Sequence, residues 1–148
     1  MNKSTGLISF FLVITLFFSC KKDGGLISSV PSIELISTNP LQVKQFQDSI
    51  TFVISYKDGD GDLGENNPNV NNLFLTDNRN NITYLYRIQQ LAPEGAKIAI
   101  EGKLDIVLNN TGIINSNSSQ TVSYSIYVVD RAGNKSNVVN SPLITVIP

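Results

Sequence analysis

The sequence lacks histidine and tryptophan, and it contains one cysteine, Cys20, among 148 residues. Without histidine, the usual zinc sites, Ser-His-Asp triads and histidine-based acid–base catalysis are excluded. One cysteine cannot form an internal disulfide or a thiolate metal cluster. Without tryptophan, the aromatic platforms typical of sugar-binding sites are missing, so a glycan ligand is less expected than a protein partner. We therefore expect the chain not to be an enzyme.

The sequence also has no marked excess of positive or of negative charge. The 11 Lys and Arg residues nearly balance the 12 Asp and Glu residues, and the formal net charge is −1. Nucleic acids and anionic lipid surfaces require a clustered basic face, so neither is expected as a partner. No window of a dozen residues has the 3.6-residue period of an amphipathic helix, so almost no helix is predicted.

The longest hydrophobic run extends from Leu7 to Phe18 and is interrupted by Ser9 and Thr15. Its 12 residues are too few to span a bilayer, which needs about 20. With Lys3 before it, the run has the features of a secretory signal peptide.

The run ends in Leu16-Phe17-Phe18 and is followed by Ser19-Cys20 and then by Lys21-Lys22-Asp23. This segment resembles the lipobox of bacterial lipoproteins, in a form similar to that of the Bacteroidota, although Phe18 is larger than usual. The resemblance implies cleavage before Cys20, lipidation of Cys20 and an anchor in the outer membrane, on its periplasmic side or at the cell surface. An ordinary secretory signal with a chance cysteine is the alternative.

Three parts of the chain are predicted from these features. Residues 1–19 form the lipoprotein signal peptide, and residues 20–31 form the lipidated cysteine with a flexible Gly- and Ser-containing tether. Residues 32–148 form one domain, as expected for this length.

Short runs with the two-residue alternation of β-strands follow the tether. Their near-regular spacing predicts an all-β domain, a seven-stranded antiparallel sandwich. The predicted strands are Ser32–Ser37, Ser49–Lys57, Leu73–Thr76, Ile82–Ile88, Lys103–Leu108, Thr121–Val129 and Asn137–Ile147.

A motif in the last two runs indicates the kind of sandwich. Tyr124 to Asn137 reads as a strand, then Asp130-x-x-Gly133-Asn134, then a strand. It resembles the final hairpin of bacterial Ig-like and fibronectin-III-like domains, which implies that fold. Asp130 can cap the turn, and Gly133 and Asn134 suit positive φ. Tyr124 would be either the tyrosine of a tyrosine corner or an ordinary core residue.

The densest charge cluster is Asp58-Gly-Asp60-Gly-Asp62-Leu63-Gly-Glu65. Ca²⁺ takes six to eight oxygen ligands, and alternating Asp residues on a Gly-rich turn can point several oxygens inward. The run resembles the EF-hand loop only at the first three ligand positions. Leu63 occupies the glycine position and Asn69 the terminal glutamate position, so an EF-hand is excluded.

In a sandwich of this type, the loop after Asp58 and the loop after Asp130 lie at the same end, where the chain also enters the domain. We therefore predict that two loops converge on a Ca²⁺ site. The alternatives are Mg²⁺ or a plain acidic turn in which Asp130 only caps its hairpin. The candidate ligands are Asp58, Asp60, Asp62, Glu65, Asp130 and Asn134.

Two functional classes fit these features. The first is a binding or adhesion module on the cell envelope, with an envelope or extracellular protein as partner. The second is a structural accessory subunit that docks to an outer-membrane assembly through a strand edge. A third and remote alternative is a glycan hydrolase that uses carboxylates between Asp58 and Glu65.

Overall fold

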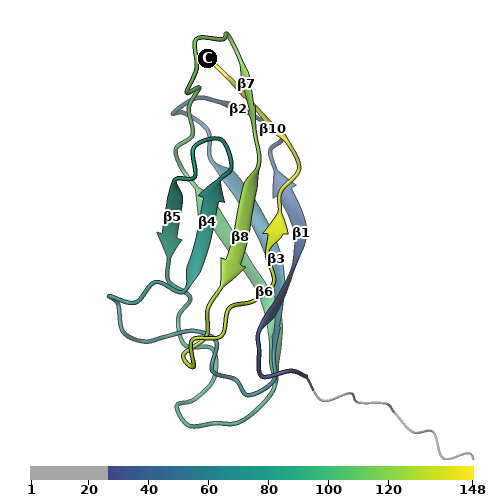
Figure 1. Cartoon of the computed structure of the whole chain (residues 1–148), viewed down its shortest axis with the longest axis vertical. Helices are drawn as coiled ribbons and strands as arrows, with labels where there is room; N and C mark the ends of the chain where they lie inside the picture. Colours follow the sequence, from purple (N-terminus) through teal and green to yellow (C-terminus); the bar gives the residue numbers. More distant parts are fainter. Residues whose placement is uncertain (1–26) are drawn as a thin grey trace, which may run out of the picture.

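The computed structural model describes residues 27–148, which form an all-β structure (Figure 1). Ten strands make three mostly antiparallel sheets, and this range contains no helix, so none that is long and apolar enough to cross a membrane. The predicted signal peptide, Cys20 and the first part of the tether lie outside the described residues.

The first sheet has the order β1-β3-β6, formed by Ser32–Asn39, Ile50–Asp58 and Ile100–Leu108. Both pairings are antiparallel, and Ile54 in the central strand lies opposite Leu35 and Leu104. β6 pairs with β3 on one side only, so its other edge is free within the described part of the chain.

The second sheet lies in front of the first in Figure 1 and has the order β5-β4-β8-β9. Its strands are Thr83–Tyr86, Leu73–Asp77, Tyr124–Val128 and Val139–Asn140, all antiparallel. A third, smaller sheet lies at the end where the chain terminates. It joins β2 (Gln42–Lys44), β10 (Ile144–Ile147) and β7 (Gln120–Val122), with β2 parallel to β10.

The core follows from the alternation along the strands. In β3, Ile50, Phe52, Ile54 and Tyr56 point inward and are buried, as the sequence pattern predicts. Phe52 meets Tyr124 of the second sheet edge to face, with ring centroids 5.3 Å apart. Burying each side chain of this size contributes about 1.5–3 kcal/mol, so this shared core holds the sheets together.

The prediction of seven strands in two sheets is corrected in three places. The run Thr121–Val129 is two strands, because the chain passes at Ser123 from the third sheet to the second. The run Asn137–Ile147 is divided around Pro142, whose ring removes a backbone donor. The strand β2 was not predicted at all, since three residues are too short to show alternation.

Candidate metal centre

Three aspartates meet where β3 ends. Asp58 is the last residue of β3, and Asp60 and Asp62 follow on the loop to β4. One carboxylate oxygen from each lies within 4.8 Å of the other two. Asp58 is 0% exposed, and Asp60 and Asp62 are partly buried. This group can hold a metal ion.

The Oδ1 atoms of these aspartates are buried and have no hydrogen-bond partner among residues 27–148. The other oxygens of Asp58 and Asp62 form hydrogen bonds. Asp58 Oδ2 accepts a hydrogen bond from the Leu63 amide at 2.9 Å, and Asp62 Oδ2 accepts one from the Ala132 amide at 3.1 Å. Buried carboxylate oxygens are normally paired or bound to metal, because leaving them desolvated and unpaired is costly. The three carboxylates, each with one buried oxygen that lacks a partner, therefore form a set suited to a hard cation.

The electrostatics of the cluster agree with this geometry. Burial raises the pKa of Asp58 above its ordinary value of 3.8, and neighbouring Asp60 raises it further. Burial also raises the pKa of Asp62, as do the charges of Asp130, Asp60 and Asp58. A cation among these groups would favour their ionised forms and offset their mutual repulsion.

The glycines between the aspartates allow other backbone segments to approach. A Cβ atom on Gly59 would lie 2.1 Å from the carbonyl oxygen of Ile27. On Gly61 it would lie 2.5 Å from that of Ile98, and on Gly64 2.2 Å from that of Gln89. Gly59 thus allows the segment at Ile27 to approach the acidic loop, and Gly61 and Gly64 allow the loop between β5 and β6 to do so. The acidic loop is therefore packed against backbone from both of these segments.

The loop after Asp130 reaches the same place. The Arg131 amide donates to the Asp62 carbonyl at 3.2 Å, and Arg131 Nη1 donates to the Gly64 carbonyl at 2.8 Å. The two loops therefore lie together at one end of the molecule, as the sequence predicted. Asp60, Asp62, Arg131 and Lys97 line a cavity of about 280 Å³ beside the cluster.

The remaining predicted ligands have other partners. Both oxygens of Asp130 accept hydrogen bonds from Asn134, from its amide at 2.7 Å and from its Nδ2 at 2.9 Å. Asp130 therefore caps its hairpin, and Gly133 has a φ of 86° in that turn. Glu65 Oε1 accepts from the Asn67 amide at 2.9 Å. A metal-binding role for Glu65, Asp130 or Asn134 stays a prediction, and so does lipidation of Cys20.

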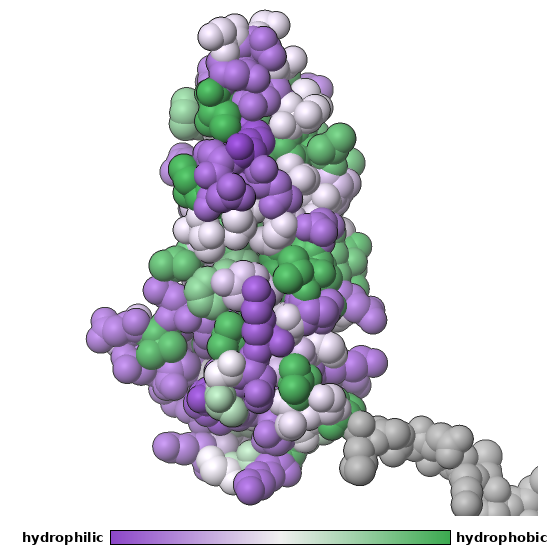
Figure 2. Space-filling view, in the orientation of Figure 1, coloured by the Kyte–Doolittle hydropathy of each residue, from purple (hydrophilic) through white to green (hydrophobic). Residues whose placement is uncertain are grey.

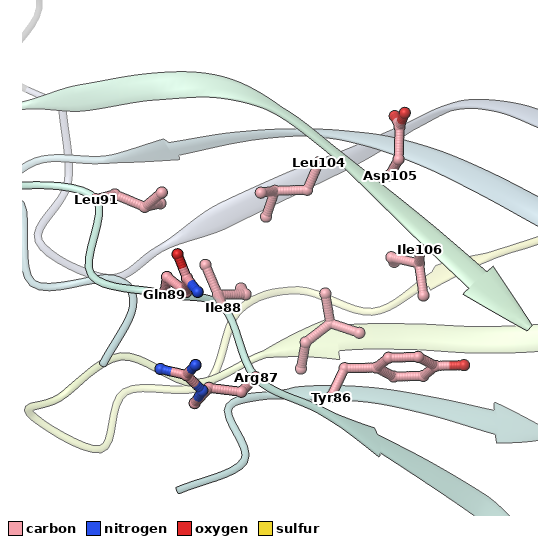
Figure 3. Close-up of a pocket in the computed structure, with 9 residues that line it drawn as sticks. Tyr86, Arg87, Ile88, Gln89, Leu91, Leu104, Asp105 and Ile106 are labelled. Atoms are coloured by element: carbon pink, nitrogen blue, oxygen red, sulfur yellow. The ribbon is translucent and has the colours of Figure 1, made fainter. Parts of the chain in front are cut away.

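A second, apolar cavity of about 320 Å³ opens between β5 and β6 (Figure 3). Ile88, Leu91, Leu104 and Ile106 converge on it in Figure 3. The Tyr86 hydroxyl crosses from β5 to donate to the Val107 carbonyl of β6 at 3.1 Å. The cavity thus lies beside two strand edges that are free within the described part of the chain.

The outer face of the second sheet carries an apolar row across three strands. Leu85 of β5 lies opposite Phe74 of β4, which lies opposite Tyr127 of β8. The rings of Phe74 and Tyr127 stack with centroids 4.7 Å apart, and Lys135 Nζ lies 3.8 Å from the Tyr127 centroid. Figure 2 shows hydrophobic side chains across the middle of this face.

No protein-family model matches the chain, and no curated protein matches it.

Sequence reasoning missed the structural ion pair at the opposite end of the second sheet. Arg79 Nη2 contacts Asp77 Oδ2 at 2.6 Å, and both side chains are largely buried. Arg79 also donates to the Gly112 carbonyl and to Gln120 Oε1. Only the proximity of the two residues in sequence could have indicated the pair, since Asp77 to Asn81 reads as an ordinary polar turn.

Proposed function

We propose that this protein is a non-enzymatic lipoprotein of the bacterial cell envelope that displays an Ig-like binding module, stabilised at one end by Ca²⁺. One observation carries the calcium assignment: Asp58 is 0% exposed, its Oδ1 has no hydrogen-bond partner among residues 27–148, and its carboxylate lies close to those of Asp60 and Asp62. Ca²⁺ prefers carboxylate oxygens and tolerates irregular geometry, which suits three side chains from one loop.

The strand order supports the Ig-like assignment. In fibronectin-III-like domains, the first, second and fifth strands form one sheet, whereas in constant-type Ig domains the fourth strand joins them. The sheets β1-β3-β6 and β5-β4-β8-β9 have the fibronectin-III-like arrangement if β2 is counted with β1, β7 with β8 and β10 with β9. Tyr124 lies in the core, and its hydroxyl meets the Thr111 hydroxyl at 2.9 Å, which is close to the role of a tyrosine corner.

Two features support a role in binding rather than catalysis. The most buried carboxylate of the cluster, Asp58, is 0% exposed and therefore inaccessible to a substrate. The remote hydrolase alternative needs two carboxyl groups on either side of an accessible sugar bond. In contrast, the row of Leu85, Phe74 and Tyr127 presents apolar surface of the kind that contacts protein partners.

The accessory-subunit alternative is favoured by the free edge of β6. This strand has nine residues, and the apolar cavity lies beside it. A strand from a larger assembly could pair with that edge and place one side chain in the cavity.

The envelope location depends on Cys20 and is tested by acyl labelling. Bacteria that express the full chain and grow with radiolabelled palmitate should incorporate label into the wild-type protein and not into the Cys20→Ala variant. Label in the variant, or none in the wild type, would contradict a lipid anchor at Cys20.

The calcium site is tested by isothermal titration calorimetry of the metal-free full chain in detergent. We expect one Ca²⁺ per chain in the wild type and none in the Asp60→Asn/Asp62→Asn variant. Asp105→Asn, on the exposed face of β6, is the matched control and should bind as the wild type does. Absence of Ca²⁺ binding by the wild type would contradict the proposal.

A further inference from the structure

The first described residues of the chain rest directly on the acidic loop. We call residues 27–31 the leading segment; it connects the domain to the predicted tether and anchor. The Gly59 amide donates to the Ser28 carbonyl at 2.8 Å. A Cβ atom on Gly59 would lie 2.1 Å from the Ile27 oxygen and 2.7 Å from the Ser28 oxygen. The contact is therefore between two backbones and requires glycine at this position.

Little else in the described structure holds the beginning of this segment. The side chains of residues 27–30 are all exposed, including Ile27 and Val30. The other hydrogen bond in this stretch is internal, from the Val30 amide to Ser28 Oγ at 3.0 Å. Firm attachment begins at Pro31, which is buried, and at Ser32, which pairs with Lys57 of β3. The backbone of Ile33 then forms two hydrogen bonds with the Asn137 side chain. The direction of residues 27–30 thus depends mainly on Gly59.

Gly59 lies between two of the three metal-binding candidates, Asp58 and Asp60. If an ion holds both carboxylates, the intervening peptide is fixed, and so is the amide that donates to Ser28. Without an ion, the negative charges repel one another across less than 4.8 Å in a partly desolvated site. The loop then loses the arrangement that the leading segment needs.

We propose that calcium at Asp58, Asp60 and Asp62 holds the leading segment on Gly59 and so shortens the stretch of chain between the domain and its predicted anchor. This inference rests on the calcium site of the proposed function. When the ion leaves, residues 27–30 detach from the acidic loop. Four residues add up to about 14 Å of reach at full extension, and the domain gains freedom to reorient.

The test is amide hydrogen exchange, followed by mass spectrometry, of the full chain in detergent with EDTA or with Ca²⁺. We expect Ca²⁺ to slow exchange at least tenfold at the Gly59 amide, which donates to the Ser28 carbonyl, in peptides that cover residues 58–60. A peptide that covers β10 serves as the internal reference and should change little. It also reveals whether removal of the ion unfolds the whole domain.

The Gly59→Ala variant distinguishes attachment of the leading segment from binding of the ion. It keeps all three carboxylates, while its Cβ displaces the Ile27 and Ser28 backbone. We expect this variant to bind Ca²⁺ in calorimetry but to show no calcium-dependent protection of the residue 59 amide, because the Ser28 carbonyl is displaced from it. Binding without protection in the wild type would overturn the attachment and leave the calcium site intact. No binding in the wild type would overturn both, and protection in Gly59→Ala equal to that of the wild type would overturn the attachment.

Discussion

Asp60 has a buried carboxylate oxygen that has no hydrogen-bond partner in residues 27–148. At the scale of single residues, such oxygens distinguish an acidic turn from a metal site, because a solvated turn would expose them to water. Four carboxylates within eight residues were visible in the sequence. The sequence also predicted that several of them would point inward, but not which ones, since this depends on the burial of Asp58 at the end of β3.

Substitution of Asp60 by Asn should change stability in opposite directions with and without calcium. In EDTA, Asp60→Asn removes a repelling charge and should raise the free energy of unfolding by about 1–2 kcal/mol. In Ca²⁺, it removes a ligand and should make the protein less stable than the wild type. Urea unfolding in both buffers measures this, with Asp105→Asn as control. The same sign in both buffers would contradict a metal-binding role for Asp60.

Tyr124 gives a prediction about alkaline pH. Burial raises the pKa of its hydroxyl to about 12, and the main opposing effect is the hydrogen bond with Thr111. Its folded pKa exceeds the ordinary value of 10.0, so its contribution to stability is complete below that value. The contribution is lost as the pH rises toward the folded pKa.

We therefore expect Tyr124→Phe to be less stable than the wild type by about 1 kcal/mol at neutral pH. This difference should shrink or reverse at higher pH, because only the wild type has a Tyr124 that ionises on unfolding. Urea unfolding at steps of pH up to strongly alkaline buffer measures it. A difference that stays constant with pH would show that Tyr124 is not held neutral in the folded protein.

At the scale of elements, the strands that sequence predicted best are those with the most regular alternation. The run Ser49–Lys57 became β3 with a shift of one residue at each end. The short strand β2 could not be predicted, because three residues show no period. Nor could the backbone contacts at Gly59, Gly61 and Gly64, since they involve segments distant in the sequence.

The close approach at Gly64 predicts that alanine destabilises the protein more at this position than at Gly95, where the backbone conformation is similar. Gly64 and Gly95 have φ angles of 92° and 74°, so alanine is strained at both. At Gly95 a Cβ meets nothing within 4 Å, whereas at Gly64 it lies 2.2 Å from the Gln89 oxygen. Gly95→Ala should cost about 1 kcal/mol, and Gly64→Ala on the order of 3 kcal/mol or more.

Thermal or urea unfolding of both variants in the same Ca²⁺ buffer measures this difference. Gly95→Ala is the matched control, because it carries the backbone strain without the backbone contact. Equal losses would mean that the segment around Gln89 moves freely away from the acidic loop, and that this loop does not organise its end of the molecule.

At the scale of the whole molecule, the two ends differ in how they are held together. The end near the chain terminus has a third sheet and the buried pair of Arg79 and Asp77. The opposite end consists of long loops around the acidic cluster, where the leading segment also enters. Sequence reasoning predicted the meeting of the loops after Asp58 and Asp130 from the fold resemblance. It could not predict how each loop contacts the other.

The calcium site is tested most directly by the melting temperature of the full chain in detergent, first in EDTA and then in millimolar Ca²⁺ or Mg²⁺. An ion at 100 times its dissociation constant adds about 2.7 kcal/mol, which raises the melting temperature by about 10 °C for a domain of this size. We predict such a rise with Ca²⁺, a smaller one with Mg²⁺, and none with Ca²⁺ in Asp60→Asn/Asp62→Asn. An unchanged melting temperature in the wild type, or an equal rise in the variant, would contradict the calcium site.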